Sequence, residues 1–490
     1  MIQVSAPIGG LNTRDSLSDM KPTDAYVLTN WFPTVGSLEL RKGFESYATG
    51  VGVGDVETLA EYHVGTNRKF LACGGTEIYN ITGGGAASSL ASGFTNARWQ
   101  WAAFNSYLLM CNGADTPQVY DGSTIAASSI SGSGLTVTEL NGVCVFKNRL
   151  FLWEEASQDF WYLDVNAITG TATKFPLSRV AGLGGNITAI ATWTIDGGDG
   201  VDDMLVIVMS SGQVVVYQGT DPSDAAAWGL QGIYHIGAPL APRGVVRAAG
   251  DLMIMTKADY YSLSQVLRTG EEKTTSTKIS GAAAAAARSY GGNYGWQAIN
   301  YPKGNRIIFN VPRNPSVTYD QHVMNTITHA WTKFEGMNAR CFGIYDSNLY
   351  FGGGGGIVYL ADEGYNDDGS NINSEARQAW NLLKSAGNKR ITAMNLRMAA
   401  EGTVTVEHGL AYDYKDSIVT QSNSSVSSGS PWDTSSWDTS DWSPESTERD
   451  LWVNTSGVGK AFSLRMRIAS QDQAISWHRT DYMYEEGFGL

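Results

Sequence analysis

The chain has few of the residues that support covalent cross-links, long charged helices or membrane spans. Only 17% of its 490 residues are charged, and only four are cysteines. These four, Cys73, Cys111, Cys144 and Cys341, form no C-x-x-C pair, so we expect reduced thiols in a protein made in a reducing compartment. The longest apolar runs, such as Met204–Met209, are far shorter than the ~20 residues that span a bilayer. No stable membrane insertion is therefore expected.

Positive charge is also scarce. The chain has 34 Lys and Arg against 48 Asp and Glu, a net charge of −14. Tight nucleic-acid binding needs cationic side chains to neutralise phosphates, so this balance argues against it. The N-terminus has no basic stretch followed by an apolar one, so no secretory signal is expected and synthesis in the cytoplasm is predicted.

The residues that are abundant point to β-structure. Hydrophobic residues make up 42% of the chain, which is enough for a core and excludes wholesale disorder. The 56 glycines are costly inside helices. The 23 tyrosines and 15 tryptophans favour strands. The sequence therefore predicts an all-β fold.

A repeated pattern runs through the middle of the sequence. A short apolar strand, a Gly/Asn/Asp turn and a strand with a tyrosine recur with a mean spacing of about 47 residues. The tyrosines are Tyr79, Tyr120, Tyr162, Tyr217, Tyr261, Tyr319 and Tyr359. This spacing is typical of a four-stranded propeller blade, and a closed ring protects strand edges. We predict a β-propeller of about seven blades over residues 51–365; a series of ordinary β-sandwiches is the alternative.

The rest of the chain divides into three parts. Residues 1–50 are expected to form an N-terminal arm that packs on the C-terminal domain. Residues 366–490 are expected to form a sandwich-like β domain, because several of its segments alternate polar and apolar residues. A Ser-, Trp- and Asp-rich insertion, 415–456, interrupts it. The alanine run 282–287 predicts a short helix between blades, with no chemistry.

The insertion carries the most unusual local pattern. Trp432, Trp437 and Trp442 are five residues apart and are accompanied by Asp433, Asp438 and Asp441. No regular strand or helix places all three indoles on one face, which favours repeated turns stabilised by aspartates. The functional interpretation is a docking loop whose indoles anchor on a neighbouring subunit or partner. The alternative is a loop packed on its own tryptophans.

Motifs for catalysis and metal binding are missing. Gly197–Met204 and Gly364–Glu375 are rich in oxygen ligands, but the first is a single repeat unit and the second begins with Gly where a calcium loop needs Asp. The six histidines form no H-x-x-x-H pair, and there is no G-x-S-x-G or Walker A sequence. We therefore expect no catalytic residue, metal or cofactor.

Three short motifs near the N-terminus carry a resemblance. They are Asn12-Thr13-Arg14-Asp15, Asn30-Trp31-Phe32-Pro33 and Arg41-Lys42-Gly43-Phe44. Together with the Trp-Asp pairs and the terminal Tyr484-Glu485-Glu486-Gly487, they make the chain similar to the tail nozzle proteins of short-tailed bacteriophages. These are also called tail tubular protein B or packaged-DNA stabilisation proteins. The resemblance covers nearly the whole chain.

The resemblance implies a structural virion protein of the phage tail. Such a subunit would form a sixfold ring below the portal and adaptor, extend the DNA channel, retain the packaged genome and guide its ejection. Its partners would be sister subunits, the adaptor ring, tail fibres or spikes, and DNA sliding past without sequence-specific binding. An acidic bore would repel the DNA backbone, although acidity also serves solubility. The alternative is a propeller-based glycan-binding or glycan-degrading tail component.

Overall fold

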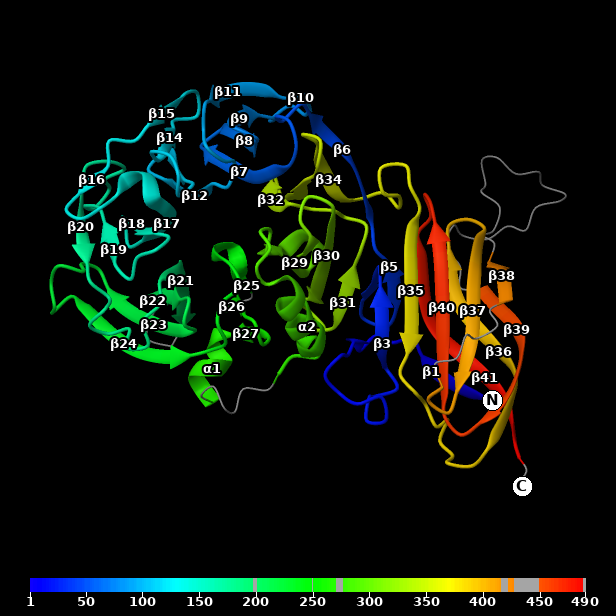
Figure 1. The fold of residues 1–490 in the computed structure, drawn as a ribbon. Helices are drawn as coiled ribbons and strands as arrows, with labels where there is room; N and C mark the ends of the chain where they lie inside the picture. Colours follow the sequence, from blue (N-terminus) through cyan, green and yellow to red (C-terminus); the bar gives the residue numbers. More distant parts are fainter. Residues whose placement is uncertain (197–200, 249, 270–275, 416–421, 427–448, 488–490) are drawn as a thin grey trace.

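The computed structural model describes residues 1–196, 201–248, 250–269, 276–415, 422–426 and 449–487. This part of the chain is mostly β, with a ring of small sheets on one side and long strands in layers on the other (Figure 1). The ring is a β-propeller. Its strands are short, alternate in side-chain direction and are separated by Gly, Asn and Asp turns.

Six blades of the propeller are separate sheets in the described residues. The first consists of β7 (Val56–Val64), β8 (Asn67–Gly74), β9 (Glu77–Asn80) and β11 (Ser88–Ser92). The second consists of β12 (Gln100–Phe104), β13 (Tyr107–Cys111), β14 (Gln118–Tyr120) and β15 (Ile125–Ala127). The third is β17 (Leu140–Phe146), β18 (Arg149–Glu154), β19 (Phe160–Tyr162) and β20 (Thr171–Phe175), with β16 (Ser131–Gly132) beside β20. The fourth is β21 (Ile187–Asp196), β22 (Val201–Met209), β23 (Gln213–Gly219) and β24 (Trp228–His235).

The remaining blades complete the ring. The fifth is β25 (Val245–Ala248), β26 (Asp251–Met255) and β27 (Tyr260–Ser262), followed by helix α1 (Leu263–Thr269). The sixth is β32 (Cys341–Tyr345), β33 (Asn348–Gly352), β34 (Val358–Glu363), β6 (Gly43–Thr49) and β10 (Gly85–Ala86). Between them lie β28 (Gln297–Tyr301), β29 (Arg306–Asn314), β30 (Thr318–Asn325) and β31 (Trp331–Phe334).

The strands β28–β31 have a double role. They occupy a place in the ring, because the inner strands β7, β12, β17, β21, β25, β28 and β32 touch in this cyclic order. They also form one end of a ten-stranded sheet that continues outside the ring. The sequence predicted about seven blades; six are sheets of their own, and one position is taken by the end of this larger sheet.

The repeated tyrosines have a common position. In each of the six separate blades the tyrosine lies on the third strand: Tyr79, Tyr120, Tyr162, Tyr217, Tyr261 and Tyr359. Tyr319 lies on β30, the third of the strands β28–β31, here called the shared unit. Tyr79, Tyr120, Tyr162, Tyr217 and Tyr319 are buried. The regular spacing therefore reflects one recurring packing position, at which a large side chain fills the space between neighbouring sheets.

The propeller is closed by a strand from the N-terminal segment. β6 pairs antiparallel with β34, although about 300 residues separate them in sequence. The predicted boundary at residue 51 falls just after this strand. A ring closed by its first and last strands has no open seam, so its ends are held together by backbone hydrogen bonds.

Gly43 begins this closing strand and has no room for a side chain. A Cβ there would lie 1.7 Å from the carbonyl oxygen of Asn366. We expect Gly43→Ala to lower the free energy of unfolding by about 1–3 kcal/mol, because the backbone at Asn366 would have to shift to make room for the added methyl group. The matched control is Gly83→Ala, where a Cβ meets nothing within 4 Å. Urea denaturation of both variants checks this. Equal free energies of unfolding for the two variants would show that the closing strand tolerates the added methyl group.

Two sheets of long strands lie beside the propeller. One contains β39 (Arg449–Gly459), β36 (Lys389–Ala400), β41 (Ile475–Glu486), β5 (Leu38–Leu40), β4 (Trp31–Pro33) and β1 (Ile2–Ser5). The other is the ten-stranded sheet, which adds β3 (Asp24–Thr29), β2 (Gly10–Leu11), β35 (Ile372–Gln378), β40 (Phe462–Ser470), β37 (Val404–Tyr412) and β38 (Ser422–Val426) to β28–β31. β38 and the start of β39 fall within the predicted insertion 415–456.

The N-terminal segment contributes strands to both of these sheets. β1 pairs with β41, and β3 pairs with β35 on one side and with β31 on the other. A single apolar cluster runs through the region and includes Trp31, Tyr260, Phe309, Met394 and Trp477, all almost fully buried. The propeller and the long sheets therefore share a core.

The predicted alanine helix is present as α2 (Ser280–Tyr290), between β27 and β28 (Figure 1). Ala283 and Ala286 are buried against the shared core, and Ala287 is also buried. Small side chains allow this close approach and favour the helix. Its role is packing, as the sequence indicated.

One buried histidine is expected to make the stability of the fold depend on pH. His322 Nδ1 lies 2.8 Å from the Tyr260 hydroxyl, and burial lowers the pKa of His322 to about 3. The ordinary pKa of histidine is near 6.5, so below this pH the unfolded chain binds a proton at His322 that the folded chain does not bind. We expect stability to fall by about 1.4 kcal/mol per pH unit from this residue as pH drops from 6.5. The free energies of unfolding of wild type and His322→Gln, measured by urea denaturation from pH 7 to 4, should converge as the pH falls. Parallel curves of free energy against pH would contradict this.

Candidate functional site

The first N-terminal motif is placed against helix α2. The backbone N–H of Thr13 donates to the Lys278 carbonyl at 2.8 Å. The Thr13 hydroxyl accepts a hydrogen bond from the Ala282 N–H at 3.0 Å. It therefore satisfies one of the free donors at the start of the helix, where Ile279 offers no side-chain cap.

Asn12, Arg14 and Asp15 shape the turn that presents Thr13. Asn12 is buried, and its Nδ2 donates to Asp24 at 2.8 Å and to Asp15 at 2.9 Å. Hydrogen bonds from Arg14 and Asn12 lower the pKa of Asp15 to about 2. Arg14 Nη1 also donates to the Ser276 carbonyl at 2.9 Å. These residues are structural ties between the N-terminal segment and α2.

The second motif meets the third at a buried ionic junction. Asn30 has a left-handed backbone (φ 60°), and its Oδ1 accepts from Arg41 Nε at 2.9 Å. Arg41 binds both carboxylate oxygens of Asp367, at 2.8 and 2.6 Å, and its remaining hydrogen bonds go to the Lys42 and Glu335 carbonyls. Asn30 Nδ2 donates to the Asn373 carbonyl at 2.7 Å.

This Arg41 junction joins three parts of the molecule. Asn30 and Arg41 belong to the N-terminal segment, Glu335 follows β31 of the propeller, and Asp367 precedes β35 of the long sheets. The Arg41 side chain is fully buried, and that of Asp367 is 11% exposed. A planar guanidinium with five donors suits such a site, because it satisfies several oxygens at once.

The other residues of the second motif are packed. Trp31 is fully buried in the shared core. Phe32 is buried in a neighbouring cluster, with the Arg306 guanidinium 4.5 Å from its ring centre. The Pro33 carbonyl accepts a hydrogen bond from Asn325 at 2.9 Å. All four residues of the second motif are thus engaged in contacts within the protein, Asn30 at the Arg41 junction and the other three beside it in the chain.

The predicted partner-docking residues lie outside the described residues. They are Trp432, Asp433, Trp437, Asp438, Asp441 and Trp442. Their assignment to a docking loop or to a self-packed loop stays a prediction. Of the two calcium-like segments, 197–200 is also outside the described residues, and in the second, Asp367 and Glu375 are engaged by arginines.

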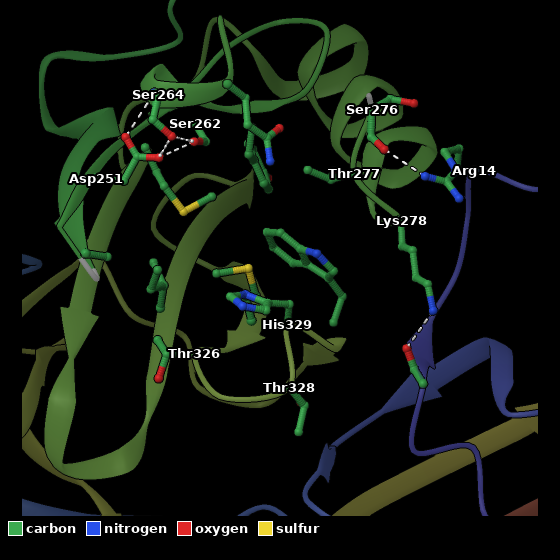
Figure 2. Close-up of a pocket in the computed structure, with 18 of the residues that line it drawn as sticks. Arg14, Asp251, Ser262, Ser264, Ser276, Thr277, Lys278, Thr326, Thr328 and His329 are labelled. Carbon is green, nitrogen blue, oxygen red and sulfur yellow. Dashed lines mark hydrogen bonds between the residues drawn. The ribbon is translucent and has the colours of Figure 1, made fainter. Parts of the chain in front are cut away.

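One cavity lies between the fifth blade, the strands β28–β31 and the N-terminal segment (Figure 2). It has a volume of about 650 Å³ and an apolar floor that includes Tyr260, Ile307 and Trp331. Polar side chains surround it, including Arg14, Lys278 and His329. Its size is within the range of small-molecule sites.

Most polar groups of this cavity are already used inside the protein. Asp251 accepts hydrogen bonds from the Ser264 hydroxyl at 2.6 Å and from the Ser264 N–H, and it also bonds Ser262 (Figure 2). This arrangement caps α1. Lys278 Nζ donates to Asp24 at 2.8 Å. In the described residues neither serine is hydrogen-bonded to a histidine, so the pair that activates a serine nucleophile is not formed here.

The axis of the propeller is closed by a side chain. Arg243, just before β25, reaches across to the Glu57 carbonyl at 2.7 Å, the Thr58 hydroxyl at 2.7 Å and the Trp99 carbonyl at 2.8 Å. Cavities of about 380 and 420 Å³ remain on its two sides. Spaces of this size fit small molecules.

Sequence reasoning missed the roles of Arg41, Asp367 and Arg243. Arg41 stood in a motif, but its partner is 326 residues away. Over the described ranges, no group of three or more His, Cys, Asp or Glu residues could hold a metal ion. None of the helices described is long and apolar enough to cross a bilayer.

Comparisons with known proteins reach only the level of distant structural likeness. No family model matches the chain, and no curated protein matches its sequence. The crystal structure of the computationally designed Ika8 protein covers 68% of this chain and 96% of its own, with 12% identity and a TM-score of 0.38.

Two natural proteins are similar to the same degree. Exo-β-1,3-galactanase from Phanerochaete chrysosporium covers 77% of this chain and 95% of its own, with 12% identity and a TM-score of 0.31. Raptor from Chaetomium thermophilum covers 66% of this chain and 29% of its own, with 10% identity and a TM-score of 0.44. Likenesses this distant leave the function of the chain open.

Proposed function

We propose that the chain is a tail nozzle subunit of a short-tailed bacteriophage, a structural virion protein made in the host cytoplasm. Copies of it would form a ring below the portal and adaptor, extend the DNA channel, retain the packaged genome and guide its ejection. The role is mechanical and includes no catalytic step. We propose a hexamer, following the resemblance of the N-terminal motifs.

The observation that carries this proposal is the Arg41 junction. Residues of the motifs that resemble nozzle proteins, Asn30 and Arg41, tie the propeller to the long sheets. The ten-stranded sheet also crosses between these parts without a linker, through β31, β3 and β35. Such a continuous body transmits force between neighbours with little hinge motion, which suits a component of a tail.

The closed axis supports a channel formed between copies. Because Arg243 bridges the propeller, DNA would pass along the centre of the ring of subunits and not through any one subunit. The net charge of −14 favours sliding of DNA without adhesion. In this proposal the long sheets form a sandwich-like platform, and the insertion 415–456 contacts a sister subunit, fibres or spikes.

Electron microscopy of the purified full-length chain tests the proposal. We expect rings with a central passage, formed alone or on addition of the adaptor of the same phage. Mass photometry should show a hexamer under the same conditions. A chain that stays monomeric at all concentrations, with and without the adaptor, would overturn the proposal.

A second candidate is a glycan-binding tail component. One observation favours it: the polar cavity of about 420 Å³ at one mouth of the propeller axis retains hydrogen-bonding groups with no partner in the described residues.

A further inference from the structure

The cavity on one side of Arg243, here called the axial cavity, is built by loops that lead into the inner strands. Asn96 and Arg98 precede β12, Asn141 stands at the start of β17, and the segment 291–296 precedes β28. The volume is about 420 Å³. Several blades thus converge on one polar space, which is where a propeller concentrates side chains from distant parts of the sequence.

The walls of the axial cavity are held by contacts within the protein. Asn293 Nδ2 donates to the Pro312 carbonyl at 2.8 Å, and the Gly295 carbonyl accepts from Asn310 at 2.9 Å. The Arg98 guanidinium lies 4.0 Å from the centre of the Tyr294 ring. The site is therefore formed before any ligand arrives, which reduces the entropy cost of binding.

Four lining groups are unused. The side chains of Gln100, Asn141 and Glu155 make no hydrogen bond in the described part of the chain, and the Tyr294 hydroxyl is enclosed without a partner there. Burial raises the pKa of Tyr294 to about 12, so its hydroxyl stays protonated. An enclosed hydroxyl without a partner is costly, and a ligand that bonds it would recover that cost.

The charges of the axial cavity are balanced. Arg98 is paired with Glu57 at 3.0 Å, and Arg340 with Asp55 at 3.0 Å. Glu155 adds a carboxylate to the lining, opposite in sign to Arg243. A strongly charged ligand of either sign would meet a like charge, so the site favours a neutral one.

We propose that the axial cavity binds a neutral saccharide unit. Two amides, a phenol and a carboxylate offer both donors and acceptors, and a sugar hydroxyl is itself both donor and acceptor. A cavity of this volume lies within the range of small-molecule sites, at its smaller end. The inference is independent of the nozzle role, because sugar binding by one subunit does not require a ring.

Tyr294→Phe is the sharpest test, because it removes only the unpartnered hydroxyl. We expect its melting temperature to equal or exceed that of the wild type, since no internal hydrogen bond is lost. Binding of glucose, galactose, mannose and N-acetylglucosamine to the full-length chain is measured by saturation-transfer NMR. We expect at least one to bind the wild type and to bind the variant about five- to tenfold more weakly, the loss of one hydrogen bond.

Asn141→Ala provides a second variant and Tyr412→Phe, on the long strand β37, a distant control. We expect Asn141→Ala to weaken binding of the same sugar and Tyr412→Phe to leave that binding unchanged. Sialic acid is measured beside the four neutral sugars as a charged sugar. Absence of binding by all four neutral sugars, binding of sialic acid alone, or equal binding by wild type and both cavity variants would overturn the proposal. Ring assembly is scored separately, so its failure and the failure of sugar binding are distinguishable.

Discussion

Replacement of Arg41 by Ala is expected to lower the free energy of unfolding by about 3–5 kcal/mol. The substitution leaves the Asp367 carboxylate and the Glu335 carbonyl without the donor that Arg41 supplies in a buried place. It also removes one of the two donors to the Asn30 amide oxygen, which keeps only the Glu335 N–H. Arg41→Lys should restore only part of the loss, since an ammonium lacks the planar fork that reaches these oxygens together. Urea denaturation followed by tryptophan fluorescence measures the effect.

A second Arg–Asp pair provides the control for this experiment. Arg68 and Asp346 also form an ion pair, but their side chains are 45% and 61% exposed. Because water and salt screen such pairs, Arg68→Ala should cost less than about 1 kcal/mol. If both alanine variants lost the same stability, the Arg41 junction would not be the tie that the structure indicates.

Replacement of Trp31 by Ala is expected to have an effect of similar size, about 3–5 kcal/mol. Trp31 is fully buried in the cluster that joins the propeller to the long sheets, so its removal leaves a large cavity at their boundary. Trp31→Phe should cost clearly less, because the indole N–H has no hydrogen-bond partner in the described residues. Thermal and urea denaturation of both variants test this.

Trp452 serves as the matched exposed residue. It lies on β39 and is 49% exposed, so Trp452→Ala should cost less than about 1 kcal/mol. A Trp31→Ala variant as stable as Trp452→Ala would mean that the two parts of the molecule do not depend on their common core.

The sequence predicted the ring well because blade formation is local. Each blade is built on a meander of at least three consecutive strands, and its tyrosine falls on the third of them; only the closing strand β6 of the sixth blade, with β10 beside it, comes from a distant part of the sequence. Strand alternation, turn residues and the spacing of about 47 residues all lie within one repeat. What this pattern could not show was that β28–β31 would continue into the larger sheet, because pairing with β3 depends on a segment from the other end of the chain.

The candidate sites were predicted less completely. The N-terminal motifs were recognised as residues, but not as the cap of α2 and the ligands of a buried arginine. Asp367 lies in the segment Gly364–Glu375, which the sequence does not predict to hold calcium, and its pairing with Arg41 had no signal in the sequence. The axial cavity had no signal, because Gln100, Asn141 and Tyr294 come from three different loops and match no motif.

The sequence alone determined that this protein is built mostly of short strands, that its middle repeats, and that it carries an acid excess. These properties depend on composition and on residues close together along the chain. Only the tertiary structure decided that β6 closes the ring, that Arg41 meets Asp367 and that Arg243 closes the axis. The backbone N–H and C=O groups that pair strands are alike in every residue, so side-chain patterns mark where strands occur but not which distant strand each one joins.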